Sequence, residues 1–223
     1  MIVDTHHHLW LIDESDLWWL TDADRVAGGA HLHDFGLAEM RETFDTVGTD
    51  RSVLVEAWGA EADQHHWLGL AEDDPTIGAV VASTNLAAPD AGAVIDRLRV
   101  YSKFRGLRLA SQDIADPDHL AREDIRWGVR EFASRDNVSL DLLLKIDDLK
   151  DVPRLAEENP GLPMILNHLA KPQTSESGYF MPWAEQIELL EPYPQIHFKI
   201  SGMLTEAGPE PSTDQLRPAV RFM

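Results

Sequence analysis

Three consecutive histidines close the first apolar segment of the chain, in the sequence VDTHHHLW. Alternate side chains of a β-strand point to the same face, so His6 and His8 project together while His7 faces the other way. Two imidazoles at one strand end can bind the same metal ion. A chance cluster is the alternative, because the chain contains ten histidines. Three histidines behind MIVDT are too few for an expression tag, and we interpret His6 and His8 as metal ligands.

Two further candidate ligands close later apolar segments. His168 ends the run in MILNHLAKP, on the same parity as Met164 and Leu166, so we expect it to reach the same end of the sheet. Glu56 ends the run SVLVEA, where a carboxylate is costly unless it is paired or bound to a metal. Either residue could instead be an ordinary polar group. We predict His168 as a third ligand and catalytic residue, and Glu56 as the next candidate ligand.

Basic and aromatic side chains supply candidates for substrate binding. Arg105 and Arg108 flank a glycine in FRGLRL, and a guanidinium suits a carboxylate, a lactone oxygen or a developing oxyanion. We predict that both bind substrate and that Arg108 also acts in catalysis; ion pairing is the alternative for Arg105. Trp18 and Trp19 could line a pocket or anchor a long loop.

Three polar residues on later segments are candidate supporting partners of the site. Asp141 interrupts the apolar run VSLDLLL, and Lys199 and Ser201 lie in IHFKISG. Each could orient a ligand or a catalytic group, although none is specific alone.

Short β-rich segments alternate with longer helix-like stretches, which predicts repeated βα units and a parallel sheet. The predicted helices cover residues 35–48, 61–74, 89–102, 117–135, 149–159 and 180–191, and a last helix is capped by Ser212, Thr213 or Asp214. The predicted strands are Ile2 to His6, Ser52 to Ala57, Ile77 to Ser83, Arg105 to Leu109, Val138 to Leu144, Pro163 to His168 and Ile196 to Ser201.

A Rossmann sheet needs a glycine-rich turn after the first strand, where this chain has histidines, so the pattern favours a (β/α)8 TIM barrel. Only seven strands are predicted, and we therefore expect a single incomplete barrel domain over residues 1–223, truncated after the seventh strand. A longer protein or a partner chain would cover the exposed edges. Residues 9–34 form a long insertion at the carboxyl end of the first strand, the face where barrels carry their active sites.

The composition restricts the classes of partner. With 39 acidic and 19 basic residues the formal net charge is −20, which disfavours nucleic acid and anionic membranes. The chain has no cysteine, so metal ligands must come from His and carboxylates. No signal peptide or span of about 20 apolar residues is present, and we expect a cytoplasmic protein with a small-molecule substrate that could form a homo-oligomer.

Four segments in order, VDTHHHLW, FRGLRL, LNHLAKP and FKISGMLTEA, resemble the amidohydrolase-2 branch of the amidohydrolase superfamily, a group of TIM-barrel metal-dependent hydrolases. The resemblance covers essentially the whole chain, and the branch includes sugar-acid lactonases and a pyrone-dicarboxylate lactonase. It implies that His6 and His8 are the first-strand ligand pair, that His168 is the sixth-strand histidine, and that Arg108 binds substrate. The carboxylated lysine and fifth-strand histidine of binuclear members have no counterpart here. The resemblance therefore implies one divalent ion, with zinc as the first candidate, or a metal that is weakly bound or absent.

The resemblance implies that the complete protein hydrolyses a small sugar-acid lactone or a related cyclic ester. It also implies a general-base aspartate at the end of an eighth strand, a segment that this sequence does not contain. The expected activity depends on that aspartate. Three alternatives stay open: a decarboxylase or other amidohydrolase on the same fold, an inactive truncated form that acts as a binding module, and a purely structural metal.

Overall fold

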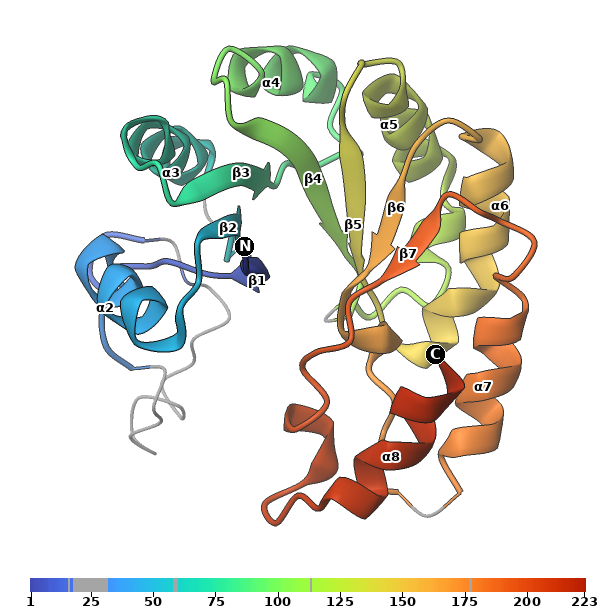
Figure 1. The fold of residues 1–223 in the computed structure, drawn as a ribbon. Helices are drawn as coiled ribbons and strands as arrows, with labels where there is room; N and C mark the ends of the chain where they lie inside the picture. The colour runs from blue at the N-terminus through green and yellow to red at the C-terminus, as the bar shows by residue number, and fades with distance from the viewer. Residues whose placement is uncertain (16, 18–31, 58–59, 113, 177) are drawn as a thin grey trace. The chain divides into compact units, whose positions relative to one another are not determined.

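The computed structural model describes residues 1–15, 17, 32–57, 60–112, 114–176 and 178–223 (Figure 1). Trp18, Trp19 and most of the predicted insertion lie outside the described residues. The contacts divide the chain into two compact units. The first comprises residues 1–84 and 93–108, and the second comprises residues 85–92 and 109–223. The interpretation of residues 1–223 as a single domain stays a prediction.

Seven strands follow one another in the sheet in chain order, which confirms the predicted α/β class. Neighbouring strands run parallel among β1 to β4 and again among β5 to β7. Parallel strands in chain order, each followed by a helix, are the organisation of a (β/α)8 barrel, of which this chain supplies seven strands. The strands are β1 (Val3–His7), β2 (Arg51–Val55), β3 (Ile77–Ala82), β4 (Phe104–Ala110), β5 (Ser139–Leu143), β6 (Met164–Leu166) and β7 (Ile196–Phe198).

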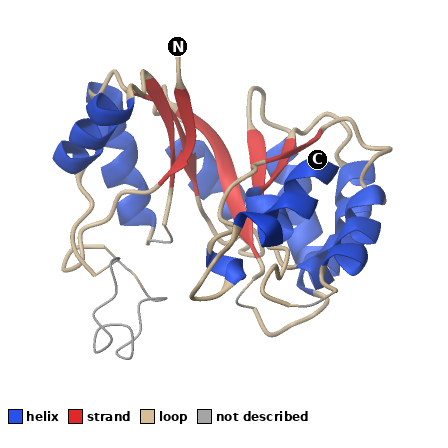
Figure 2. Ribbon diagram, turned by 60° about the horizontal axis from the view of Figure 1, so that its bottom comes forward, coloured by secondary structure: helices blue, strands red, loops and turns tan. Residues whose placement is uncertain are grey.

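Helices alternate with the strands along the chain (Figure 2). The predicted helix over 117–135 is divided, because Arg122 has an extended backbone between a short 3-10 turn and α5. Ser212 caps the last helix, as predicted, by accepting a hydrogen bond from Gln215 N. The α-helices are α2 (Leu37–Val47), α3 (Glu61–Asp73), α4 (Ala91–Leu98), α5 (Glu123–Ala133), α6 (Val152–Glu158), α7 (Phe180–Glu188) and α8 (Thr213–Phe222), and the 3-10 turns are η1 (His119–Ala121), η2 (Ile146–Asp151), η3 (Asn167–Ala170) and η4 (Thr205–Ala207).

The first unit fixes both ends of the long segment that follows β1. Trp10 and Phe35 form an antiparallel bridge with two backbone hydrogen bonds, and Trp10 Nε1 donates to His33 O at 3.0 Å. Ile12 N also donates to Asp34 Oδ1 at 2.8 Å. These contacts bring residues more than twenty positions apart together beside β1.

In the second unit, α6 and α7 lie on one side of β6 and β7 (Figure 1). Trp183 of α7 is fully buried, and burial of its large indole contributes roughly 2–3 kcal/mol of hydrophobic stabilisation to the packing of this helix. A separate ion-pair network joins α5 to α6 through Arg126, Arg130 and Glu158. No helix in the described part of the chain is both long and apolar enough to span a membrane.

Candidate metal and substrate site

The rings of His6 and His8 converge at the end of β1. Their Nε2 atoms lie 3.2 Å apart and the ring centroids 4.9 Å apart, with the rings nearly perpendicular. The alternation expected from the sequence is therefore present for this pair. Ile2, predicted as the first residue of this strand, instead precedes it and is 56% exposed, so that strand boundary was wrong.

A backbone carbonyl fixes the chemical form of His8. Its Nδ1 lies 2.6 Å from Val55 O, and a carbonyl oxygen only accepts, so Nδ1 carries the proton of the neutral ring. Nε2 of His8 then presents its lone pair toward His6. Metal-binding histidines commonly donate their second ring N–H to a backbone carbonyl in this way.

The spacing of the two Nε2 atoms fits one bound ion. Two nitrogen ligands at about 2.0–2.1 Å from a tetrahedral zinc ion stand about 3.3 Å apart. The observed separation is 3.2 Å, which also suits an imidazole–imidazole hydrogen bond in the metal-free pair. The donor type, the spacing and the tautomer of His8 are those expected of two ligands of one divalent ion.

His7 faces away from the pair, as the strand alternation predicts. Its Nε2 lies 2.9 Å from Ser52 Oγ, and its ring packs edge-on against Phe44 of α2. Burial lowers its pKa to about 4, against the opposing effect of the nearby Asp4 carboxylate. His7 is neutral at pH 7 and serves the packing of the first unit.

Glu56 and Arg108 are both buried in the first unit, each about 5% exposed. Arg108 Nη2 donates to Glu56 O, and Ser83 Oγ donates to Glu56 Oε2 at 3.2 Å. Glu56 directly follows β2, and Arg108 lies near the carboxyl end of β4. The structure thus links these two predicted site residues through the Glu56 backbone.

Arg105 occupies a different place from the one predicted. It is the second residue of β4, at the amino end, and its exposed side chain donates to Ser102 O and Phe104 O at 2.7 and 2.6 Å. Parallel barrels carry their active sites at the carboxyl ends of the strands. Its placement at the mouth of the barrel was therefore wrong, because Arg105 lies three positions before Arg108, toward the amino end of the strand. Its role in substrate binding stays a prediction.

His168 belongs to the second unit and does not continue β6, which ends at Leu166. The parity argument that extended the strand to His168 was wrong. His168, Leu169, Ala170 and Lys171 all have positive φ, between 52° and 55°. Four successive non-glycine residues in the left-handed region are unusual, since each costs about 1 kcal/mol or more.

Neighbouring elements hold this left-handed turn in place. Trp183 Nε1 donates to Leu169 O at 2.7 Å, and Leu169 N donates to Lys199 O at 3.2 Å. Lys199 N in turn donates to Leu166 O at 2.9 Å, before the turn begins. These hydrogen bonds come from α7 and from the residue after β7, so the turn is determined by tertiary contacts.

A buried polar cluster lies beneath the turn in the second unit. Asp141 Oδ2 accepts from Lys199 Nζ at 2.6 Å and from Asn167 Nδ2 at 2.9 Å, and Asp141 and Asn167 are essentially inaccessible. Two of the three predicted supporting residues therefore pair with each other. Sequence reasoning missed Asn167, although its position next to His168 was a usable signal.

The structure brings together two of the predicted ligands, His6 and His8. In the described part of the chain, no group of three His, Asp or Glu side chains is close enough to hold a metal ion. Trp18 and Trp19 fall outside the described residues, and their pocket-lining role stays a prediction. Ser201 was predicted as a supporting residue, and its Oγ lies 2.9 Å from Nδ1 of His168.

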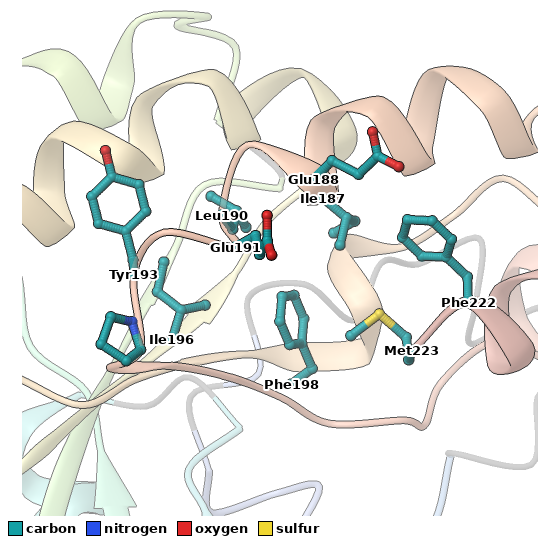
Figure 3. Close-up of a pocket in the computed structure, with 10 residues that line it drawn as sticks. Ile187, Glu188, Leu190, Glu191, Tyr193, Ile196, Phe198, Phe222 and Met223 are labelled. Carbon is teal, nitrogen blue, oxygen red and sulfur yellow. The ribbon is translucent and has the colours of Figure 1, made fainter.

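A groove of about 580 Å³ in the second unit contains none of the predicted site residues. Figure 3 shows Phe198, at the end of β7, facing it, with Met223 and Phe222 along one side and Glu188 and Glu191 above. Its lining combines apolar side chains with the polar groups of Glu188, Glu191 and Tyr193. The groove has the character of a packing surface beside β7 and offers no convergent catalytic groups.

Comparison with known proteins gives a consistent assignment. The family described as Amidohydrolase (Amidohydro_2) matches residues 3–222. An L-fucono-1,5-lactonase of Burkholderia ambifaria is 30% identical over 220 residues, which cover 98% of this chain and 73% of the lactonase. A second L-fucono-1,5-lactonase, from Burkholderia multivorans, is 27% identical over 92% of this chain and 69% of its own length.

Solved structures show the same fold. An amidohydrolase from Burkholderia multivorans, crystallised with bound zinc, superimposes with a TM-score of 0.85 at 24% identity. The match covers 100% of this chain and 78% of the amidohydrolase chain. A probable 2-pyrone-4,6-dicarboxylic acid hydrolase from Acinetobacter baumannii matches with a TM-score of 0.77 at 17% identity, over 99% of this chain and 78% of that chain.

Proposed function

The chain belongs to the amidohydrolase family, and from that premise we propose that it is a metal-dependent hydrolase of a small sugar-acid lactone. The observation that carries the proposal is the convergence of His6 and His8 at the spacing of two ligands of one ion. The L-fucono-1,5-lactonase relatives support a lactone as the substrate class.

His6 and His8 would hold one divalent ion, with zinc the first candidate because the donors are imidazole nitrogens. When bound, such an ion would supply Lewis-acid chemistry, by polarising the lactone carbonyl or lowering the pKa of water. The Val55 carbonyl keeps the His8 lone pair on Nε2, which prepares this residue for binding. The same proposal includes a single bound ion, with His168 as a further ligand and Glu56 as another.

Arg108 and His168 complete the proposed machinery. Addition of water to the lactone carbonyl carbon places negative charge on the carbonyl oxygen, and the Arg108 guanidinium would stabilise that charge from the carboxyl end of β4 before the ring C–O bond breaks. His168 would bind the metal or move a proton at its Nε2. Trp18 and Trp19 are proposed to contact the sugar ring. The cytoplasmic location, a homo-oligomeric state and the extent of the single barrel domain also stay predictions.

The test measures hydrolysis by the native full-length protein on a panel of 1,4- and 1,5-aldonolactones with a pH indicator. We expect turnover of at least one 6-deoxy-sugar lactone well above the spontaneous rate, lost on chelation and restored by zinc or another divalent ion. Aryl carboxylic acids in the same panel test for decarboxylation. Turnover of the acids without any lactone hydrolysis would contradict the proposal.

A further inference from the structure

The ring of His168 is contacted by two consecutive residues that follow β7. Its Nδ1 lies 2.9 Å from Ser201 Oγ. A Cβ placed on Gly202 would stand 2.5 Å from Cγ and 2.6 Å from Nδ1 of the same ring, closer than unbonded atoms approach. Gly202 also has a φ of +67°, which side chains rarely adopt. The backbone therefore approaches the imidazole as closely as glycine alone permits.

The backbone of His168 likewise depends on the segment after β7. His168 begins the left-handed run that ends at Lys171, and the next residue, Leu169, donates its N–H to Lys199 O. Lys199, Ser201 and Gly202 thus contact the turn at three points within four residues. The orientation of the imidazole is set by this neighbouring segment rather than by β6.

We propose that Ser201 and Gly202 are positioning residues for His168. In this role the Ser201 hydroxyl oxygen accepts a hydrogen bond from the Nδ1–H of His168 and so favours the tautomer that carries its lone pair on Nε2, while Gly202 leaves the space that the ring occupies. A neutral imidazole has one donor and one acceptor nitrogen, so fixing one nitrogen fixes the other. The proposal rests on the proposed function, in which Nε2 of His168 binds the metal or moves a proton.

The first test compares Ser201→Ala with Ser201→Thr, which keeps the hydroxyl. In metal-free protein with ¹⁵N-labelled histidine, long-range ¹⁵N–¹H spectra report the tautomer of each ring, and His168→Gln identifies the His168 signals. We expect the Nδ1–H form in the wild type and in Ser201→Thr, and a shift toward the Nε2–H form in Ser201→Ala. On the lactone substrate, kcat of Ser201→Ala should fall about 10- to 100-fold with little change in KM.

A wild-type ring in the Nε2–H form, or the same tautomer in Ser201→Ala as in the wild type, would overturn the proposal. The spectra need no enzymatic turnover. Absence of lactone hydrolysis in every form would therefore defeat the proposed function while the tautomer comparison still decides the role of Ser201.

The second test compares Gly202→Ala with Gly48→Ala. Gly48 also has a left-handed φ, of +76°, but a Cβ there would meet nothing within 4 Å. Both variants carry backbone strain, and only Gly202→Ala displaces the imidazole. We expect the His168 signals to move and kcat to fall at least tenfold in Gly202→Ala alone, measured where circular dichroism shows both folded. Equal behaviour of the two variants would overturn the role of Gly202, and if Gly202→Ala does not fold, Ser201→Ala decides.

Discussion

His6 and His8 lie at the end of a strand whose alternation alone brings their rings together, whereas His168 lies in a turn held by α7 and by residues after β7. In the first case two neighbours in sequence cooperate, and one carbonyl of β2 fixes the tautomer of His8. In the second, the local backbone is strained, and contacts from Trp183 and Lys199 offset the cost.

The difference teaches how each region should respond to mutation. The pair at β1 depends on its own two side chains. Substitution of His6 or His8 should therefore abolish metal binding, whereas substitutions elsewhere in the chain should be tolerated. The turn at β6 depends on residues 14 to 34 positions further along the chain. Substitutions far from His168 in sequence should therefore disturb it.

The largest effect is expected for the double variant His6→Ala, His8→Ala. Losing both ligands removes several kcal/mol of transition-state stabilisation, so kcat/KM should fall at least about 10³-fold. Zinc content, measured by mass spectrometry after dialysis, should fall with it. His66→Ala, which removes an exposed histidine of α3, should change neither quantity. Retained zinc and activity in the double variant would defeat the assignment of the pair.

The next effect concerns the polar cluster beneath the turn. Asp141→Ala would remove the carboxylate that pairs with Lys199, whose side chain is only 11% exposed. Removing one member of a buried pair costs about 3 kcal/mol or more in the free energy of unfolding. The double variant that combines Asp141→Ala with Lys199→Met removes both charges, and it should recover much of the lost free energy of unfolding. Urea denaturation of both variants measures this, and additive losses would mean that the pair is not coupled.

The same contrast explains what the sequence could predict. The pairing of His6 with His8 and the outward turn of His7 follow from a period of two, and the seven strands follow from apolar segments at regular spacing. The end of β6 could not be predicted, because no glycine or asparagine in HLAK signals a left-handed run. That turn exists only because Trp183 and the segment after β7 hold it. The position of Arg105 was predicted wrongly, because the apolar pattern of FRGLRL does not show where the strand begins and ends.

The smallest effect is expected at Glu158, which lies in the α5–α6 ion-pair network and belongs to neither histidine region. Hydrogen bonding from Arg126, with support from Arg154 and Arg130, lowers the pKa of this carboxyl despite its partial desolvation. A depressed folded-state pKa stabilises the protein above the unfolded value near 4.5, and this stabilisation is lost as the pH falls through the folded pKa.

Glu158→Gln should therefore lower the free energy of unfolding by about 1 kcal/mol at pH 7 and flatten its decline below pH 4.5. Glu185→Gln, at an exposed position of α7, is the control and should change neither. Thermal unfolding of the three proteins between pH 3 and pH 7 measures both quantities. Because the network holds helices and not the turn, the His168 ring signals should stay unchanged in Glu158→Gln. A shift of those signals would show that the turn depends on the α5–α6 network as well as on the segment after β7. The His168 region would then differ from the His6–His8 pair by its dependence on the helices too.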